Sequence, residues 1–284
     1  MKIAIVANPG KQGAQAYFPE IASRLASLGA VLLLEDKDQE KFPFEGASYL
    51  QKEELYRECD LVLALGGDGT ILHTVTYAAP LGKPVLGVNA GTLGFMAGLE
   101  TNELYKLPRL FTGEYTLDRR MLLDVRIEGE NAVYYALNDA VISKGTVSRI
   151  LDLTVTLNGR EIASYRADGV ILSTPTGSTA YSLSAGGPVL DPEMDGMLVT
   201  PICPHSLFDR SILFKDDSVV SITASTRYGE GAYLTVDGRL GRALEPKDTV
   251  TIRLSLIHIS IPKRICNRTA ANSKKRLFHS QNVV

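Results

Sequence analysis

The chain has 284 residues, enough for two domains, and its hydrophobic and charged fractions of 45% and 22% are those of an ordinary soluble globular protein. It has no run of about eighteen apolar residues and begins in a strand pattern, so we expect neither a membrane-spanning helix nor a signal peptide. The net charge is −2. Because Cys59, Cys203 and Cys266 fit neither a disulfide framework nor a zinc site, we expect a cytoplasmic protein with reduced thiols.

The first part of the chain alternates between strand and helix patterns joined by short turns. The expected strands are 2–8, 31–35, 60–66 and 84–89, and the expected helices are 12–28, 48–58, 69–79 and 102–111. This alternation predicts an α/β domain over 1–116 with an open, mostly parallel sheet. Ligands of such sheets bind beyond the carboxyl ends of the strands.

The pattern changes near Tyr115, where apolar residues begin to alternate with polar ones. A hairpin is expected over 153–162, since Asn158-Gly159 is a preferred two-residue turn between strands. Further strands are expected at 219–224, 233–236 and 249–254. We therefore expect a β-rich, sandwich-like domain over 117–255.

The end of the chain is basic. After Asp248 there are seven Lys or Arg residues and no Asp or Glu, whereas the preceding chain has 23 basic and 32 acidic residues. We expect 256–284 to be a disordered tail, or one foreign to the rest of the protein. A nucleic-acid-binding module is the weakest interpretation, because the rest of the chain is acidic and lacks a nucleic-acid-binding motif.

The central motif is a glycine-rich loop, Gly66-Gly67-Asp68-Gly69-Thr70, between the strand at 60–66 and a helical pattern. Such a loop brings backbone N–H groups and a helix N-terminus close to an anion, and so is typical of a phosphate site. A carboxylate in that position suits Mg²⁺ binding or proton abstraction. The alternative is a tight turn in which Asp68 only caps the helix. The loop by itself leaves both interpretations open.

A second motif runs from Arg166-Ala167-Asp168-Gly169 through a strand into a segment rich in small hydroxyl residues, 173–188. Small residues let a flat ligand approach the backbone, and the hydroxyls supply directional hydrogen bonds. We favour a ligand site here over a loop of capping residues. By themselves, Asn138-Asp139 and Asp237-Gly238 are more typical of turns.

Together these segments resemble the NAD kinase family, which phosphorylates NAD to NADP. The resemblance covers Lys2 to about Leu254; the glycine loop is shared with lipid kinases and phosphofructokinases, while 89–95 and especially 168–188 are more specific. The family resemblance implies an α/β domain followed by a β-rich domain. It also implies ATP as phosphoryl donor, Mg²⁺ or another divalent cation, and a homodimer or homotetramer.

The resemblance also assigns roles to individual residues. Asp68 would be the general base for the 2′-hydroxyl of the adenosine ribose, next to the phosphate-binding residues Gly66, Gly67, Gly69 and Thr70. The NAD-binding residues would be Asp68, Gly69, Phe95, Asn138, Asp139, Arg166, Asp168, Thr176, Thr179, Ala180, Tyr181, Ser184 and Asp237. Many members have Glu where this chain has Asp139. No metal ligands are identified.

Two other functions share parts of this pattern. A lipid or diacylglycerol kinase would use the same glycine loop, but it needs an apolar acceptor pocket, and 174–184 is polar. A dinucleotide-binding sensor without catalysis would not need the carboxylate of Asp68. Both are therefore less favoured than a kinase acting on NAD.

Overall fold

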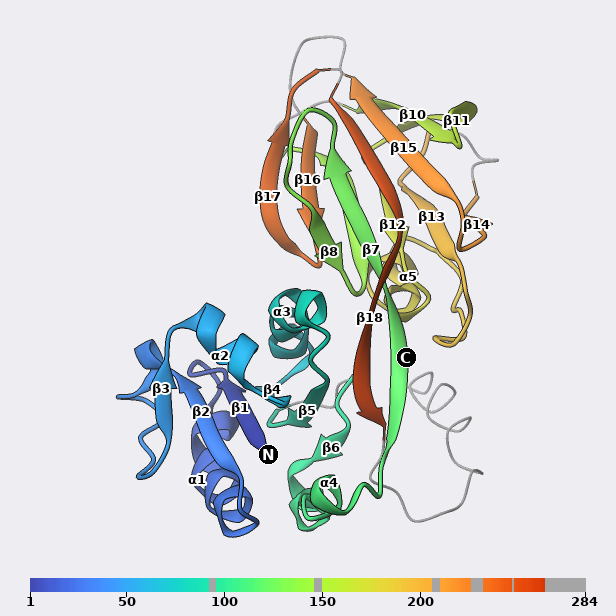
Figure 1. The fold of residues 1–284 in the computed structure, drawn as a ribbon. Coiled ribbons are helices and arrows are strands. Elements are labelled where there is room, and N and C mark those ends of the chain that lie inside the picture. The colour runs from blue at the N-terminus through green and yellow to red at the C-terminus, as the bar shows by residue number, and fades with distance from the viewer. Residues whose placement is uncertain (92–95, 146–149, 206–209, 226–231, 247, 264–284) are drawn as a thin grey trace. The chain divides into compact units, whose positions relative to one another are not determined.

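The computed structural model describes residues 1–91, 96–145, 150–205, 210–225, 232–246 and 248–263. The chain divides into two compact units. The first contains Met1–Ile71, Leu86–Asp118 and the described residues from Ile261, and the second contains Leu72–Val85 and Arg119–Ser260. Each unit is described by itself below, and Figure 1 labels most of the elements of both.

The first unit is built on a six-stranded sheet in the order β3-β2-β1-β4-β5-β6. Its strands are β1 (Lys2–Ala7), β2 (Val31–Glu35), β3 (Ser48–Leu50), β4 (Leu61–Gly66), β5 (Val85–Asn89) and β6 (Leu99–Glu100). The β1–β2, β1–β4, β2–β3 and β5–β6 pairs are parallel. Every residue of β4 and β5 is buried, as expected of central parallel strands that are covered on both faces.

Helices complete this unit. They are α1 (Gln12–Ser27), α2 (Lys52–Glu58), α4 (Arg109–Thr112) and the first residues of α3 (Asp68–Ala78), with 3₁₀ turns at Asp36–Asp38 and Thr101–Lys106. The rest of α3 and a 3₁₀ turn at Ala79–Leu81 are counted with the second unit. Helix α1 buries Phe18, Ile21 and Leu25 against the sheet and stops where Gly29 takes a positive φ of 82°. The predicted α/β architecture is thus confirmed.

Two of the predicted helices are shorter than expected. The helix predicted over 48–58 begins only at Lys52, because Ser48–Leu50 pairs with β2 as an edge strand. The helix predicted over 102–111 is a 3₁₀ segment followed by α4. Pro108, which lacks an N–H group, stands between them and interrupts the helical hydrogen bonds.

The second unit contains two six-stranded sheets, β11-β10-β15-β18-β7-β8 and β14-β13-β12-β9-β16-β17. The strands of the first are β7 (Thr116–Ile127), β8 (Tyr134–Ala136), β10 (Leu151–Leu157), β11 (Arg160–Ala167), β15 (Val219–Ser225) and β18 (Thr249–Lys263). Those of the second are β9 (Asp139–Lys144), β12 (Gly169–Ser173), β13 (Met197–Ile202), β14 (Ile212–Phe214), β16 (Ala232–Val236) and β17 (Arg239–Leu244). The antiparallel pairs in the first of these sheets are β10–β11, β10–β15, β15–β18 and β7–β8. Those in the second are β12–β13, β9–β12, β13–β14, β16–β17 and β9–β16. Between β12 and β13 lie a 3₁₀ turn, Thr176–Thr179, and a short helix, α5 (Tyr181–Ser184).

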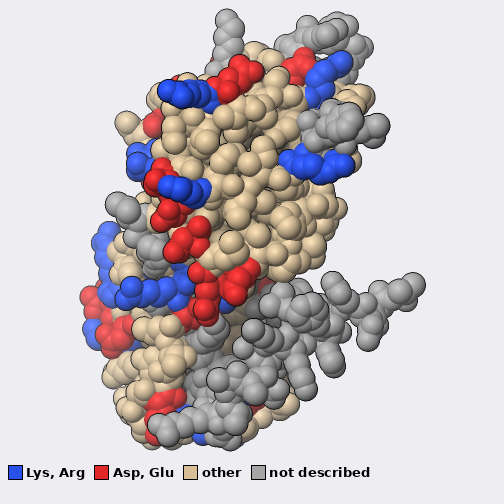
Figure 2. Space-filling view, turned by 90° about the vertical axis from the view of Figure 1, so that its right-hand side faces the viewer, with Lys and Arg blue, Asp and Glu red and all other residues tan. Residues whose placement is uncertain are grey.

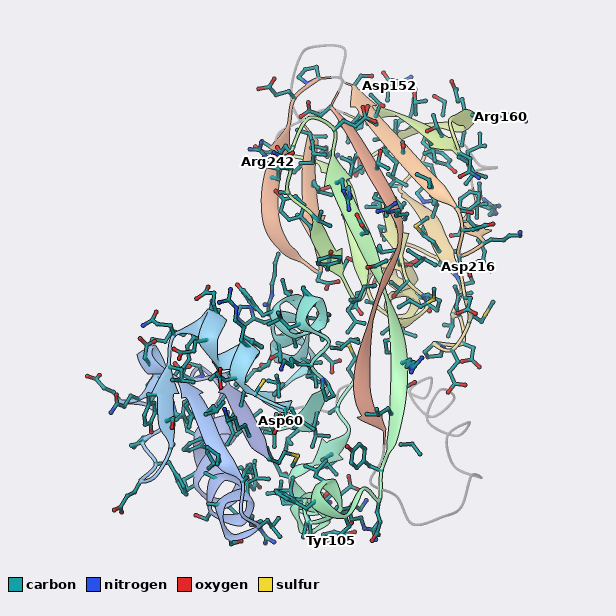
Figure 3. The ribbon with its side chains drawn as sticks, viewed as in Figure 1. Asp60, Tyr105, Asp152, Arg160, Asp216 and Arg242 are labelled. Carbon is teal, nitrogen blue, oxygen red and sulfur yellow. The ribbon has the colours of Figure 1, made fainter. Side chains whose placement is uncertain are left out.

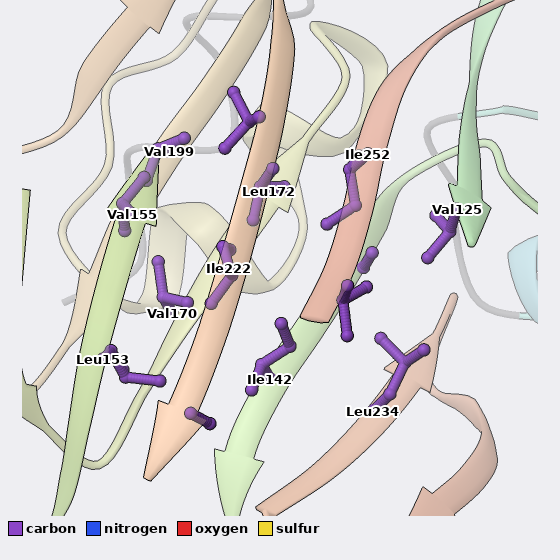
Figure 4. Packing of buried hydrophobic residues seen from close by; sticks show 14 of the residues in the cluster. Val125, Ile142, Leu153, Val155, Val170, Leu172, Val199, Ile222, Leu234 and Ile252 are labelled. Atoms are coloured by element: carbon purple, nitrogen blue, oxygen red, sulfur yellow. The ribbon is translucent and has the colours of Figure 1, made fainter. Parts of the chain in front are cut away.

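The two sheets share one apolar core. Leu153 and Ile222 come from one sheet and Ile142 and Leu172 from the other, and all four are fully buried in the same cluster (Figure 4). The predicted β10–β11 hairpin is present, with Asn158 and Gly159 at φ of 50° and 79° in its turn. The expected sandwich-like fold is therefore confirmed.

The predicted end of the folded chain at Ser255 is too early. Strand β18 continues to Lys263, and Ile259 is fully buried. The reason is visible in the sequence, since Ile257, Ile259 and Ile261 alternate with other residues and extend the strand pattern. The rest of the predicted tail, 264–284, lies outside the described residues.

The packing of the sandwich predicts a large loss of stability when the core is truncated. Ile222 is fully buried between the two sheets, so Ile222→Ala should lower the free energy of unfolding by about 2–5 kcal/mol. The matched control is Ile162→Ala on edge strand β11, where the side chain is 40% exposed. Urea titration measures both variants. Equal losses for the two would contradict the core assignment.

Among the described residues, no helix combines the length and apolar character that crossing a bilayer requires.

Candidate functional site

The glycine loop joins β4 to α3, as the sequence predicts. The carbonyl of Gly66 accepts a hydrogen bond from Ala90 N at 2.9 Å, which links the carboxyl ends of β4 and β5. A Cβ on Gly66 would overlap the buried Thr70 side chain, whereas one on Gly67 would meet open space. The loop therefore needs glycine at Gly66 for packing and leaves the backbone of Gly67 accessible to a ligand.

Asp68 is the first residue of α3 and does not occupy its N-cap. Gly67 has that position, because its carbonyl accepts hydrogen bonds from Thr70 N at 2.8 Å and Ile71 N at 3.3 Å. Oδ1 of Asp68 accepts a hydrogen bond from Met96 N at 3.3 Å. The half-buried carboxylate is thus fixed by the chain that follows β5, and the capping interpretation does not explain it.

The residues at the end of β5, which is hydrogen-bonded to the glycine loop, are closely packed and hydrogen-bonded. Gly13 of α1 lies so close to the strand that a Cβ would overlap the carbonyl oxygen of Ala90. The Asn89 side chain donates to Glu100 Oε2 at 2.9 Å and accepts from Gly91 N at 3.1 Å. The next residues, 92–95, are outside the described part of the chain, and with them the predicted NAD contact of Phe95.

A second set of residues lies in the β-sandwich unit, where β9 and β12 pair side by side. Asn138 precedes β9, and Thr174 follows β12. Thr174 N donates to Asn138 O at 2.9 Å, and Thr174 Oγ1 donates to Leu137 O at 2.5 Å. A Cβ on Gly177 would overlap the carbonyl of Asn138. The two segments that the sequence singled out separately, 138–139 and 174–184, are therefore in direct contact.

Asp237 belongs to the same cluster. It lies in the β16–β17 turn, and its carboxylate accepts hydrogen bonds from the backbone N–H groups of Leu137, Asn138 and Asp139. Burial raises the pKa of Asp237, and the three N–H donors oppose that shift. Burial and the nearby charge of Asp237 raise the pKa of Asp139 to about 7.

Two polar groups lie side by side at this end of the β9–β12 ladder. Ser173 and Asp139 are directly opposite each other in the register, so their side chains share one face of the sheet. Ser173 is fully buried and, within the described residues, its hydroxyl has no hydrogen-bond partner. Because buried hydroxyls are almost always paired, this point suits a ligand or a water that carries hydrogen-bonding groups.

The hydroxyl-rich segment itself is mostly well ordered by its own hydrogen bonds. Ser178 Oγ accepts from Leu190 N at 3.0 Å, and Ser182 pairs with Thr200 at 2.9 Å, so these two hydroxyls hold the loop. Among the residues predicted to bind NAD, Thr176 is buried, Thr179 and Ala180 are half-buried, and Tyr181 and Ser184 are exposed. Tyr181, 46% exposed, is available for stacking.

Arg166 and Asp168 lie at the other end of the β9–β12 ladder. Asp168 forms an ion pair with Lys144 at 2.7 Å, and Arg166 forms one with Asp152 at 3.2 Å. Of these residues, Figure 3 labels Asp152. The register pairs Ser143 with Gly169 and Asp139 with Ser173, a separation of about 13 Å along the strands. The structure therefore does not bring Arg166 and Asp168 into the cluster around Asn138.

One residue in contact with the segment was missed from the sequence. Arg120 Nη1 on β7 donates to Thr176 Oγ1 at 3.2 Å, and the guanidinium is half-buried. The only signal was a pair of arginines, Arg119-Arg120, at the start of a long strand pattern. Basic residues at strand ends are too common for that signal to be used.

Taken together, the two units carry the groups of a kinase. One has an accessible glycine loop with a fixed carboxylate at a helix N-terminus, which suits phosphate and proton transfer. The other has a buried polar cluster suited to a ligand with hydroxyl groups. In the part of the chain that the structure describes, no group of three or more His, Cys, Asp or Glu residues could hold a metal ion by itself.

Comparisons with known proteins define the family. Residues 3–115 match the ATP-NAD kinase N-terminal domain, and residues 137–261 match the ATP-NAD kinase C-terminal domain. The chain belongs to the ATP-NAD kinase family, and it is an enzyme with NAD kinase function. The match to residue 261 agrees with the full length of β18 and corrects the predicted boundary at Ser255.

Curated relatives and solved structures agree with this assignment. The NAD kinase of Symbiobacterium thermophilum is 43% identical over 88% of this chain and 89% of its own. That of Carboxydothermus hydrogenoformans is 45% identical over 71% and 73%. Yeast NADH kinase, solved with NADH, has a TM-score of 0.89 at 25% identity and covers 100% of this chain and 89% of its own. An Archaeoglobus fulgidus NAD kinase solved with ATP has the same fold, with a TM-score of 0.76 at 23% identity over 98% of each chain.

Proposed function

We propose that this enzyme transfers the γ-phosphoryl group of ATP to the 2′-hydroxyl of the adenosine ribose of NAD, with Asp68 as the general base. The observation that carries this proposal is that Asp68 lies within an accessible glycine loop and is not the N-cap of α3, a position that Gly67 has. A ribose hydroxyl is a poor nucleophile, and a positioned base contributes about 10²–10⁴-fold to its reaction.

The glycine loop accounts for phosphate binding in this proposal. Gly67 and Gly69 present the backbone at the N-terminal end of α3, where partial positive charge favours an anion. No P-loop lysine motif is present in the sequence, so the loop and a metal ion take its place.

Mg²⁺ fits the available donors. It is usually bound by one or two carboxylates together with substrate phosphates and water, so it needs no cage made of protein groups alone. Because Asp68 is proposed as the base, the ion would be held mainly by the phosphates of ATP and by water. When bound, the ion would neutralise charge on the triphosphate.

The dinucleotide site is proposed to lie around Asn138, Asp139 and the hydroxyl-rich segment. Asn138 and Asp139 would hold the adenosine part of NAD, because the half-buried amide of Asn138 and the buried carboxyl group of Asp139 suit ribose hydroxyls. Thr176, Thr179, Ala180, Tyr181 and Ser184 would line the pocket. Arg166 and Asp168 keep their proposed role at the nicotinamide half, although they lie at the far end of the β9–β12 ladder in this chain.

A small-molecule substrate also fits the surface charge. On the face seen in Figure 2, the described Lys and Arg side chains are interspersed with Asp and Glu and form no single basic stripe. Nucleic-acid-binding proteins cluster basic residues on one face. The homodimer or homotetramer and the cytoplasmic location that the sequence predicts stay predictions.

The acceptor can be tested by offering the substrates of the two kinase hypotheses in parallel reactions. Purified protein with ATP and Mg²⁺ is offered NAD in one reaction and diacylglycerol vesicles in another. We expect NADP in the first, measured with an NADP-specific dehydrogenase, and no phosphatidic acid in the second. Phosphorylation of diacylglycerol without formation of NADP would refute the proposal.

A further inference from the structure

The hydrogen bonds of Asp237 are unusual in number and in reach. Oδ2 accepts from Leu137 N at 2.9 Å, and Oδ1 accepts from Asn138 N at 2.7 Å and from Asp139 N at 3.1 Å. These donors are about 100 positions away in the sequence. Asp237 and Gly238 form the β16–β17 turn with positive φ values of 50° and 66°, so the carboxylate projects from a tight, well-defined hairpin.

The backbone carbonyl groups of Leu137, Asn138 and Asp139 are hydrogen-bonded as well. Leu137 O accepts from Thr174 Oγ1, and Asn138 O accepts from Thr174 N. Asp139 O accepts from Asp237 N at 2.9 Å. Every backbone N–H and C=O group of 137–139 is therefore bonded to either Thr174 or Asp237, and a backbone so fully satisfied has little freedom to move.

The carboxylate of Asp237 is therefore suited to a different role from the one that the sequence predicts. An ionised carboxylate has about four acceptor sites, and three of those of Asp237 are taken by backbone N–H groups. A direct contact with NAD is therefore not its main task. The side chains that it positions, Asn138 and Asp139, are the ones placed at the adenosine in the proposed function.

We propose that Asp237 is a positioning residue of the dinucleotide site, whose carboxylate fixes the backbone of 137–139 so that Asn138 and Asp139 meet the substrate in one orientation. This inference rests on the proposed function. Since Asp237 acts on bound NAD through two other residues and does not touch the reacting atoms, its loss should weaken NAD binding far more than it slows the chemical step.

The variant that tests this is Asp237→Asn. Asparagine tolerates the positive φ of the turn and keeps one carbonyl oxygen, but its NH₂ group would face one of the three N–H donors. We expect the KM and the Kd for NAD to rise about tenfold or more, with kcat changed less than about threefold. Calorimetry with NAD gives the Kd independently of activity.

The matched control is Asp248→Asn in the same unit. Asp248 also accepts a backbone hydrogen bond, from Glu245 N at 2.8 Å, but this bond lies within its own turn between β17 and β18. KM, Kd and kcat should all stay within about twofold of the unmodified enzyme. A rise in KM equal to that of Asp237→Asn would overturn the inference, because any turn carboxylate would then have the same effect.

Other outcomes also decide the matter. If Asp237→Asn lowers only the melting temperature, with the Kd for NAD unchanged, the residue is merely structural and the inference is wrong. A loss confined to kcat would likewise overturn it. If the unmodified chain binds NAD but makes no NADP, the proposed function fails, while the Kd of the variant still tests the positioning role.

Hydrogen exchange covers the case in which the variant does not fold. In the unmodified full chain, the amides of Leu137, Asn138 and Asp139 should exchange slowly, although Leu137 and Asn138 lie outside any strand. Rapid exchange at these three amides would show that the carboxylate does not hold them, and would overturn the inference.

Discussion

Asp68→Asn should lower kcat by about 10²-fold or more while leaving the Kd for NAD nearly unchanged. The substitution keeps the size of the side chain and an oxygen that can accept the hydrogen bond from Met96 N. It removes only the basic carboxylate. Because Gly67 is the N-cap of α3, the start of the helix should not depend on this side chain. Parallel measurements of turnover and calorimetric NAD binding separate the two effects.

Asp60→Asn is the control for that experiment. Asp60 directly precedes β4, at the end opposite the glycine loop, and its carboxylate accepts from Lys2 N at 2.7 Å (Figure 3). The same chemical change at this exposed position should leave kcat within about twofold. Near-normal turnover of Asp68→Asn would rule out Asp68 as the base, and an equal loss in both variants would point to a general effect on the unit.

Gly177→Ala should be the most damaging single-methyl change in the β-sandwich unit. The added Cβ would overlap the carbonyl of Asn138, which is already fixed by Thr174. Either the loop or Asn138 must move, at a cost of about 1–3 kcal/mol in stability. Because both are proposed to bind NAD, we also expect the Kd for NAD to rise at least tenfold. Thermal unfolding and calorimetry measure the two effects.

Gly241→Ala provides the comparison. Gly241 lies in β17, and its φ is not positive. A Cβ added at this residue would meet open space. Its melting temperature and NAD affinity should remain close to those of the unmodified chain. If Gly177→Ala were equally harmless, the close contact between 138 and 177 would not exist in solution.

Local sequence signals predicted much of this fold. The Asn158-Gly159 turn depends on positive φ values at two adjacent residues, and Gly66 is required by its close contact with Thr70, four positions along the chain. The strand-and-helix alternation of the first unit and the period-two strands of the second are local in the same sense. Two element boundaries were predicted wrongly because their signals are weak. Ser48–Leu50 is a short edge strand, and the alternating pattern that continues β18 beyond Ser255 lies in a basic segment.

The candidate site was harder to predict because its contacts are not local. Asn138 and Asp237 each looked like ordinary turn residues, and no pattern in one sequence shows that the carboxylate of one binds the backbone of the other. The contact between Arg120 and Thr176 could not be predicted for the same reason, because the two residues are 56 positions apart. The sequence motifs singled out these residues, but only the paired strands β9, β12 and β16 show which of them meet.

The position of the new phosphate on NAD tests the central claim most directly. The product of the reaction with ATP, Mg²⁺ and NAD is purified, and phosphorus–proton correlation by NMR shows which carbon carries the added group. The account predicts coupling to the 2′ proton of the adenosine ribose. Coupling to a 3′ proton or to the nicotinamide ribose, or the absence of any phosphorylated dinucleotide, would contradict it.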